Sequence, residues 1–396
     1  MDRRRLAPEM SGSSIATFAV VFLVYALGAW IPLPGLDAEK LASMTSFSLD
    51  PSMARFSIFS LGLVPLFTVL AHAEIAKLLF PRLVRWQEAS SRNASRWNDV
   101  LHISTLVLTA VQGYGIMVGL RAVGVVDDTD AIAVPVSLAT FVGSTALLIW
   151  LVDRLRLPGL GNGFWFLWLA PLVGALPATF LQQVDLIRTG GMAPSMMLFG
   201  LVYALVAALL AVTATLIVIQ APKTNEASQA RQKDRAETQR ILAAVIWPPF
   251  LASIAAGYLI LLYPLVWPAE GGDLSGAIAV SHIVATALLL PLFSYLYGRQ
   301  RTDIHGAVSD ARDDESTRLL FHYGLAGLLQ SALCAGIGLL VWIYPVFGSW
   351  SGAQLIAVVA VTMSLASCWR SGSGSLPPGA VVPVALRTTG SAPSAG

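Results

Sequence analysis

Apolar residues occur along this chain in long blocks separated by shorter polar stretches. Each block is near the length of about 20 residues that an α-helix needs to cross a hydrocarbon layer of about 30 Å. Backbone groups inside a membrane must bond within their own segment, and the alternating segments typical of a membrane barrel are absent from the sequence. The pattern therefore predicts an all-α polytopic membrane protein with about ten transmembrane helices. The predicted spans are 14–32, 57–80, 101–120, 132–152, 164–182, 195–219, 242–266, 276–297, 319–345 and 352–369.

The composition supports this interpretation. Of the 396 residues, 56% are hydrophobic and only 12% are charged, whereas a soluble domain carries about 25% charged residues.

The chain begins with MDRRR, and its first apolar block ends in IPLPGLD, without a clear small-residue cleavage site. This block is also too long for the apolar region of a signal peptide. We therefore expect an uncleaved first span.

Lysine and arginine are divided unevenly between the two sets of loops. One set, which includes both termini, holds 20 of the 25 basic residues, and Lys77 lies within a span. Loops rich in Lys and Arg stay on the cytoplasmic side of a membrane. The pattern therefore predicts that both termini are cytoplasmic, in agreement with an even number of spans. The opposite set of loops holds only Lys40, Arg55, Arg121 and Arg188.

The polar stretch 221–241 is expected to project into the cytoplasm, and we place the division between two sets of five spans there. An odd number of spans in each half gives the halves opposite orientation, as in an inverted repeat. The halves show no sequence similarity, so this expectation rests on the count alone. The resulting segments are an N-terminus at 1–13, an N-terminal half at 14–220, the loop at 221–241, spans seven to ten within 242–369, and a tail at 370–396. The tail is rich in Ser, Gly, Pro and Ala, which predicts disorder.

Common catalytic and metal-binding motifs are absent from the sequence. It contains no HExxH, no GxxxxGK[ST] phosphate loop and no GxSxG elbow. The five histidines are scattered, and Cys334 and Cys368 do not have a zinc-site spacing. We therefore expect no enzyme activity, no metal, no other cofactor and no nucleic-acid partner. A membrane-embedded enzyme that uses scattered polar residues remains an alternative.

Four stretches resemble the SecY family, the channel subunit of the Sec preprotein translocon. They occur in the family's order and spacing, and the resemblance is good over roughly residues 15–220, with a weaker return at Phe347–Met363. It implies a protein-conducting channel that moves preproteins across, or inserts them into, the cytoplasmic (inner) membrane of a bacterium. The stretches are YALGAWIPLPGLD (Tyr25–Asp37), ARFSIFSLGLVP (Ala54–Pro65), VQGYGI (Val111–Ile116), and IWLVDRLRLPGLGNG (Ile149–Gly163) followed by ALP (Ala175–Pro177).

The resemblance also implies a pore ring and a plug. A ring of bulky apolar side chains excludes water from the waist of such a channel, and a short plug helix lies behind it. The alternatives are ordinary core or lipid-facing residues for the ring, and an ordinary loop for the plug. The implied ring positions are Leu63, Phe67, Trp168, Leu172 and Ile254, the last only after a one-residue shift. The implied plug is Thr45, Ser46, Phe47, Ser48, Leu49, Asp50, Pro51, Ser52, Met53, Ala54 and Arg55.

Two charged residues lie within the second span. Glu74 and Lys77 are spaced i,i+3, so they can pair on one helix face. Charges inside a membrane are costly and normally face a partner or a cavity. In the family this helix lines the lateral gate, through which signal sequences reach lipid, so the resemblance implies a role in tuning the gate. Proton coupling, as in a secondary transporter, is the alternative.

The turn between the fourth and fifth spans carries the family motif at Gly159, Gly161, Asn162 and Gly163. Glycines permit a tight turn with positive φ between packed helices. We expect a structural role for these residues.

The resemblance implies SecE-like and SecG-like small subunits, a SecA motor or a ribosome, unfolded preproteins with their signal sequences, and membrane lipid as partners. Residues 221–241 and 298–318 lack the family's docking sequences, although Arg299 and Arg301 are candidates for motor contact. Their alternative role is to anchor orientation. A SecY-derived scaffold or insertion factor that no longer works with the motor is the second hypothesis. The third is a small-molecule transporter, but it requires broken helices with a polar cluster at the midplane, where only His72, Glu74 and scattered Ser and Thr are found.

Overall fold

The computed structural model describes residues 12–36, 56–122, 124–126, 132–157, 161–220, 230–262, 274–306, 313–344 and 351–372. Most of these residues are α-helical. Within them the single strand pair is antiparallel β1 (Arg156–Leu157) with β2 (Gly161–Asn162). The helices are α1 (Gly12–Trp30), α3 (Val64–Leu79), α4 (Pro81–Glu88), α5 (Ser91–Ala122), α6 (Ala133–Arg154), α7 (Phe164–Gly174), α8 (Leu176–Arg188), α9 (Pro194–Ile219), α10 (Ala230–Leu261), α12 (Leu274–Gly306), α13 (Asp313–Ile343) and α14 (Gly352–Gly372).

Every one of the predicted spans overlaps a described helix. Among the described residues, seven helical stretches are long and apolar enough to cross a membrane, with α7 and α8 counted as one, and α3 with α4 forms a further candidate bent by 106°. Val20–Trp30 of α1 and Gly352–Leu365 of α14 are shorter apolar helices. The expectation of an all-α polytopic membrane protein is confirmed.

These helices expose many large apolar side chains and also surround a buried apolar core. Large apolar side chains such as Ile103, Leu198 and Leu205 are more than 60% exposed, which is the expected arrangement for surfaces that meet lipid. Thr105 and Thr109 are fully buried, and each hydroxyl donates to the carbonyl four residues earlier. The helices therefore turn apolar faces outward as well as inward, and the buried hydroxyls of Thr105 and Thr109 are bonded within α5.

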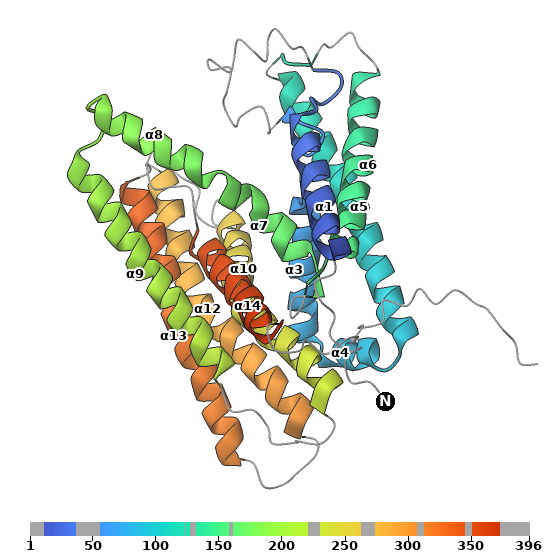
Figure 1. The fold of residues 1–396 in the computed structure, drawn as a ribbon, viewed down its shortest axis with the longest axis vertical. Coiled ribbons are helices and arrows are strands. Elements are labelled where there is room, and N and C mark those ends of the chain that lie inside the picture. Colours follow the sequence, from blue (N-terminus) through green and yellow to red (C-terminus); the bar gives the residue numbers. More distant parts are fainter. Residues whose placement is uncertain are drawn as a thin grey trace, which may run out of the picture.

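The helices form two groups, which Figure 1 shows side by side. One contains α1, α3, α5 and α6, and the other contains α9, α10, α12, α13 and α14, with α7 between them. Helix α9 packs on α13 and α14, so the sixth span belongs with the second group. The division that we placed at 221–241 is therefore wrong, because six predicted spans precede it and only four follow. The packing puts the division before α9, between the fifth and sixth predicted spans.

The predicted cytoplasmic loops are shorter than expected. Helix α10 already begins at Ala230, and α12 continues to Gly306 before α13 begins at Asp313. Much of 221–241 and 298–318 is therefore helical, because charged residues continue the helix beyond the apolar block. The proposed plug, Gly159, the first 11 residues and the tail from 373 lie outside the described residues.

The first two family stretches pack together at one end of the first group. Backbone bonds join Leu33 to Phe56 and Ile58 to Ile31 across the end of α1. The ring of Phe59 lies so close to α1 that a Cβ on Gly28 would come within 2.0 Å of it. Only glycine fits at position 28, because the Phe59 ring packs directly against the α1 backbone there. This contact holds the segment that leads into α3 against α1.

Candidate functional site

Six aromatic side chains meet where α3, α7 and α10 come together. We call Phe67, Phe164, Trp165, Trp168, Trp247 and Phe250 the aromatic cluster. Trp165 and Trp168 are three residues apart on α7, and Trp247 and Phe250 are three apart on α10. Residues at this spacing share one helix face. Each helix therefore presents its rings to the same place, and the cluster joins the two helix groups.

Phe67 of α3 contacts rings on both α7 and α10. Its ring stacks on Trp168 with centroids 4.9 Å apart and on Trp247 at 5.9 Å, and it meets Phe250 edge-on at 5.1 Å. These are favourable geometries for aromatic pairs, each worth about 0.5–1.5 kcal/mol beyond area burial. Phe67 therefore links the first helix group to both α7 and α10.

The structure brings two of the predicted ring residues, Phe67 and Trp168, into direct contact. Leu63, Leu172 and Ile254 belong to the same hydrophobic core, but that core extends through both helix groups, so membership does not by itself put them beside Phe67. The role of all five in a pore ring stays a prediction.

Sequence reasoning missed four members of the aromatic cluster. These are Phe164, Trp165, Trp247 and Phe250. The available signal was the density of aromatic residues in FWFLWL and in the IWPPF stretch, which our focus on the family's isoleucine positions passed over.

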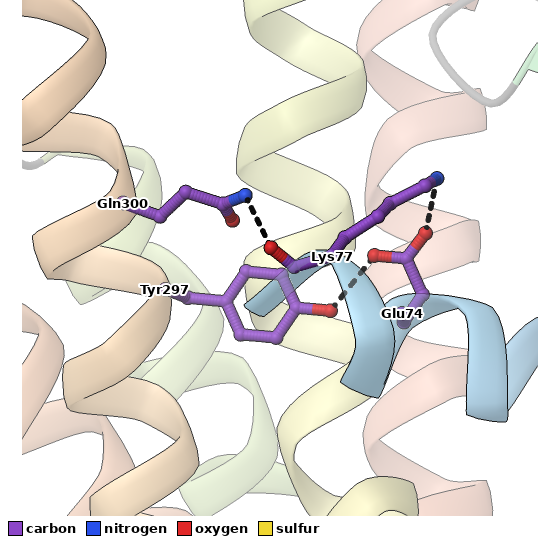
Figure 2. A network of polar contacts seen from close by, with 4 residues as sticks. All are labelled: Glu74, Lys77, Tyr297 and Gln300. Atoms are coloured by element: carbon purple, nitrogen blue, oxygen red, sulfur yellow. Dashed lines mark hydrogen bonds and ion pairs between the residues drawn. The ribbon is translucent and has the colours of Figure 1, made fainter. Parts of the chain in front are cut away.

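A second contact between the helix groups is polar, and Figure 2 shows it. Glu74 and Lys77 of α3 form the predicted i,i+3 pair, with 2.8 Å between Lys77 Nζ and Glu74 Oε1. From α12, the Tyr297 hydroxyl donates to Glu74 Oε2 at 3.1 Å, and Gln300 Nε2 donates to the Lys77 carbonyl at 3.5 Å. We call these four residues the polar bridge. It ties α3 to α12 through a carboxylate that is about four-fifths buried.

His72 provides a further link, from α3 to α10. Its Nε2 lies 2.7 Å from the Tyr258 hydroxyl, while Nδ1 lies 2.6 Å from the Thr68 carbonyl. Because the carbonyl accepts, Nδ1 carries the proton, and in the neutral ring Nε2 then accepts from the Tyr258 hydroxyl. Helix α3 is thus held to the second group by stacked rings, a tyrosine–histidine bond and the polar bridge.

The glycine motif begins α7 against the end of α6. The Gly163 N–H donates to the Val152 carbonyl at 3.0 Å, and a Cβ on Gly163 would lie 2.3 Å from Leu155 Cβ. Asn162 Oδ1 accepts from the Phe164 N–H at 3.4 Å, at the first turn of α7. The expected positive φ is wrong for Gly163, whose φ is −77°. Close packing, not a left-handed backbone, requires glycine there.

We expect Gly163→Ala to lower stability by roughly 1–3 kcal/mol, because the added methyl group overpacks the contact with Leu155. The matched control is Gly174→Ala at the other end of α7, where an added Cβ meets nothing within 4 Å. That change should be neutral or slightly stabilising, since alanine favours a helix over glycine. Thermal unfolding of both variants in detergent tests this, and equal midpoints would contradict the packing argument.

The structure places both candidate docking residues in α12. Arg299 is exposed near the end of α12, and the backbone of Arg301 lies in its last turns. Among the described residues, no group of three or more His, Cys, Asp or Glu side chains is arranged to hold a metal ion.

Comparison with known proteins identifies relatives for a large part of the chain. A sequence model of the family described as SecY matches residues 57–307. The "Protein translocase subunit SecY" of Pseudomonas aeruginosa is 29% identical over 182 residues, which cover 43% of this chain and 41% of the relative. That of Buchnera aphidicola is 26% identical over 192 residues, 44% of each. The chain spans about half the length of the curated relatives it matches.

Solved structures with the same fold cover nearly all of the chain. One described as "The structure of a protein conducting channel" superposes with a TM-score of 0.55 at 13% identity, covering 94% of this chain and 96% of that one. One described as "Sec61 in the Canine ribosome-channel complex from the endoplasmic reticulum" gives the same TM-score, identity and coverage. At this identity the likeness establishes the fold.

Proposed function

The chain belongs to the SecY family, and we propose that it forms the protein-conducting channel subunit of a bacterial cytoplasmic membrane. It would move unfolded preproteins across the membrane or release their signal sequences into lipid. The observation that carries the proposal is the meeting of Phe67, Trp168 and Trp247 from three different helices at the junction of the two groups. A channel that is closed at rest needs an apolar seal at such a junction.

The aromatic cluster suits this role for a physical reason. A hydrophobic constriction closes a pore by excluding water, without binding any particular side chain. Rings from helices of both groups separate when the groups part, so the seal opens by the same movement that admits a polypeptide. Leu63, Leu172 and Ile254 would complete the ring, and Thr45–Arg55 would serve as the plug.

The polar bridge suits a lateral gate between α3 and α12. Tyr297 is 7% exposed and donates across this interface to Glu74, so parting the helices breaks a bond to a carboxylate. A signal sequence that enters between the two helices must supply the free energy needed to break this hydrogen bond. Glu74 and Lys77 would therefore set how easily the gate opens.

The proposal includes the partners and orientation that the family resemblance implies. Both termini would be cytoplasmic, and SecE-like and SecG-like subunits would complete the channel. A SecA motor or a ribosome would supply the polypeptide, with Arg299 and Arg301 near the docking face.

Photocrosslinking tests the channel directly. A photoreactive phenylalanine analogue replaces Phe67, and in a control variant it replaces Leu328, which is 60% exposed on α13. A secretory precursor is then stalled midway in membranes that contain the protein and its small subunits. We expect the precursor to crosslink at position 67 and not at position 328, because a polypeptide in the pore must pass the aromatic cluster.

A standard SecY treated in parallel, with the analogue at its own ring position, controls for the stalled precursor. Equal labelling at both positions, or none where the standard channel labels, would overturn the proposal. The chain would then be a SecY-derived scaffold or insertion factor.

A further inference from the structure

Two helices of the second group contain proline within a membrane-spanning stretch. Helix α10 carries Pro248 and Pro249, and α12 carries Pro291. Proline has no N–H, so the carbonyl four residues earlier loses its helical donor. Pro249 frees the carbonyl of Val245 in this way, and Pro291 frees that of Ala287. A carbonyl left without a donor in the membrane interior is costly.

Two neighbouring residues of α13 bond to these carbonyls. Gln330 Nε2 donates to the Val245 carbonyl at 3.0 Å, and Ser331 Oγ donates to the Ala287 carbonyl at 2.6 Å. Gln330 is 1% exposed, so it has left both water and lipid. The amide orientation is forced, since an amide oxygen cannot bond to a carbonyl oxygen.

The geometry of α13 allows one helix to serve two neighbours. Consecutive residues point about 100° apart around a helix, so Gln330 meets α10 while Ser331 meets α12. Close packing brings α12 within reach, since a Cβ on Gly327 would lie 2.7 Å from Ser294 Cβ and 3.1 Å from Pro291 Cα.

The polar bridge contains a third, longer example. The Lys77 carbonyl lies in the last turn of α3, where carbonyls lack a helical donor in any case. Gln300 donates to it at 3.5 Å, so a side chain again bonds to a free carbonyl at the junction of α3 with α12, which Figure 2 shows.

We propose that Gln330 and Ser331 are positioning residues that bind the proline-freed carbonyls of α10 and α12 and thereby fix the aromatic seal. Trp247 and Phe250 flank the two prolines of α10, so any movement of the helix there moves the rings that contact Phe67. This inference rests on the proposed function for the meaning of the seal. The bonds from Gln330 and Ser331 to the carbonyls that proline leaves free are observed contacts and do not depend on that function.

Paired substitutions test the inference. Gln330→Leu should lower the unfolding midpoint in detergent by several degrees and raise ion leak through reconstituted protein several-fold, counted per folded molecule. In a Pro249→Ala background, where residue 249 again has an N–H for Val245, Gln330→Leu should have little further effect. Pro248→Ala is the matched control, because it restores a donor to Ala244 and should not rescue. Ser331→Ala with Pro291→Ala gives the parallel cycle.

Each outcome decides the question. Rescue by Pro249→Ala but not by Pro248→Ala supports the proposal, whereas equal effects of Gln330→Leu in all three backgrounds overturn it. A merely structural role would lower the midpoint without raising leak per folded molecule, and that result would also overturn the assignment as positioning residues. If even Phe67→Ala does not leak while the midpoints still show specific rescue, the assignment of the seal fails and the bonds to the proline-freed carbonyls survive. Crosslinking at position 67 then decides the channel proposal separately.

Discussion

Proteoliposomes that contain the Phe67→Ala variant should leak ions about 10- to 100-fold faster than those with the unchanged protein, when no precursor is present. Phe67 contacts Phe164, Trp168, Trp247 and Phe250, and its loss leaves a gap where α3 meets α7 and α10. Losing two or more ring pairs removes roughly 1–3 kcal/mol of stabilisation of the closed arrangement, in addition to the contribution of the buried apolar area. A factor of ten corresponds to about 1.4 kcal/mol, which gives the expected range.

The matched control for this measurement is Phe180→Ala. Phe180 lies on α8 and is 48% exposed, so its loss removes the same number of atoms from a lipid-facing surface. A further test combines Phe67→Ala with Trp168→Ala. If the two rings form one seal, the second substitution should add much less than it does alone. Full additivity, or a leak from Phe180→Ala as large as that from Phe67→Ala, would contradict the assignment of the seal.

The sequence predicts the fold well for a physical reason. Crossing a hydrocarbon layer imposes a length and an apolar composition on each segment, and these are local properties. Each predicted span therefore overlaps a helix, including 164–182, although α7 ends at Gly174 and α8 begins at Leu176. Pro171 and Pro177 flank this break. The predicted helix boundaries are less accurate where polar residues continue a helix. Helix α10, for example, begins at Ala230, whereas the predicted span begins at residue 242.

The site is harder to predict because its contacts join distant parts of the chain. The pairing of Glu74 with Lys77 follows from their i,i+3 spacing, but the tyrosine that meets Glu74 is 223 residues away. No periodicity links these positions. The Gln330 contact also depends on which neighbour α13 packs against. The prolines of VIWPPF indicate that backbone donors are missing in α10, but they do not show which residue replaces them. The misplaced division of the helices has another cause, since six predicted spans precede residue 221. Two sets of five spans already require a division before α9, where the packing also puts it.

Removing the Tyr297 hydroxyl should make the gate between α3 and α12 easier to open. Tyr297→Phe deletes the donor to Glu74 and leaves the Glu74–Lys77 pair within α3. A hydrogen bond to a charged group contributes about 1.5–3 kcal/mol, so the open population should rise about 10- to 100-fold. Precursors with weakened signal sequences should then be transported better, because less binding free energy is needed to part the helices. Transport of such a precursor into membrane vesicles measures this.

Two comparisons separate this gate effect from a general loss of packing. Tyr295→Phe removes the same hydroxyl group from a residue two positions earlier on α12 that is 41% exposed, and it should leave transport of the weakened precursor unchanged. Glu74→Gln weakens both the ion pair and the tyrosine bond, so it should favour opening at least as strongly as Tyr297→Phe. The double variant should gain little more, because both changes act on one contact. If Tyr297→Phe behaves like Tyr295→Phe while Glu74→Gln still favours opening, the ion pair with Lys77 controls the gate and the bond across to α12 does not.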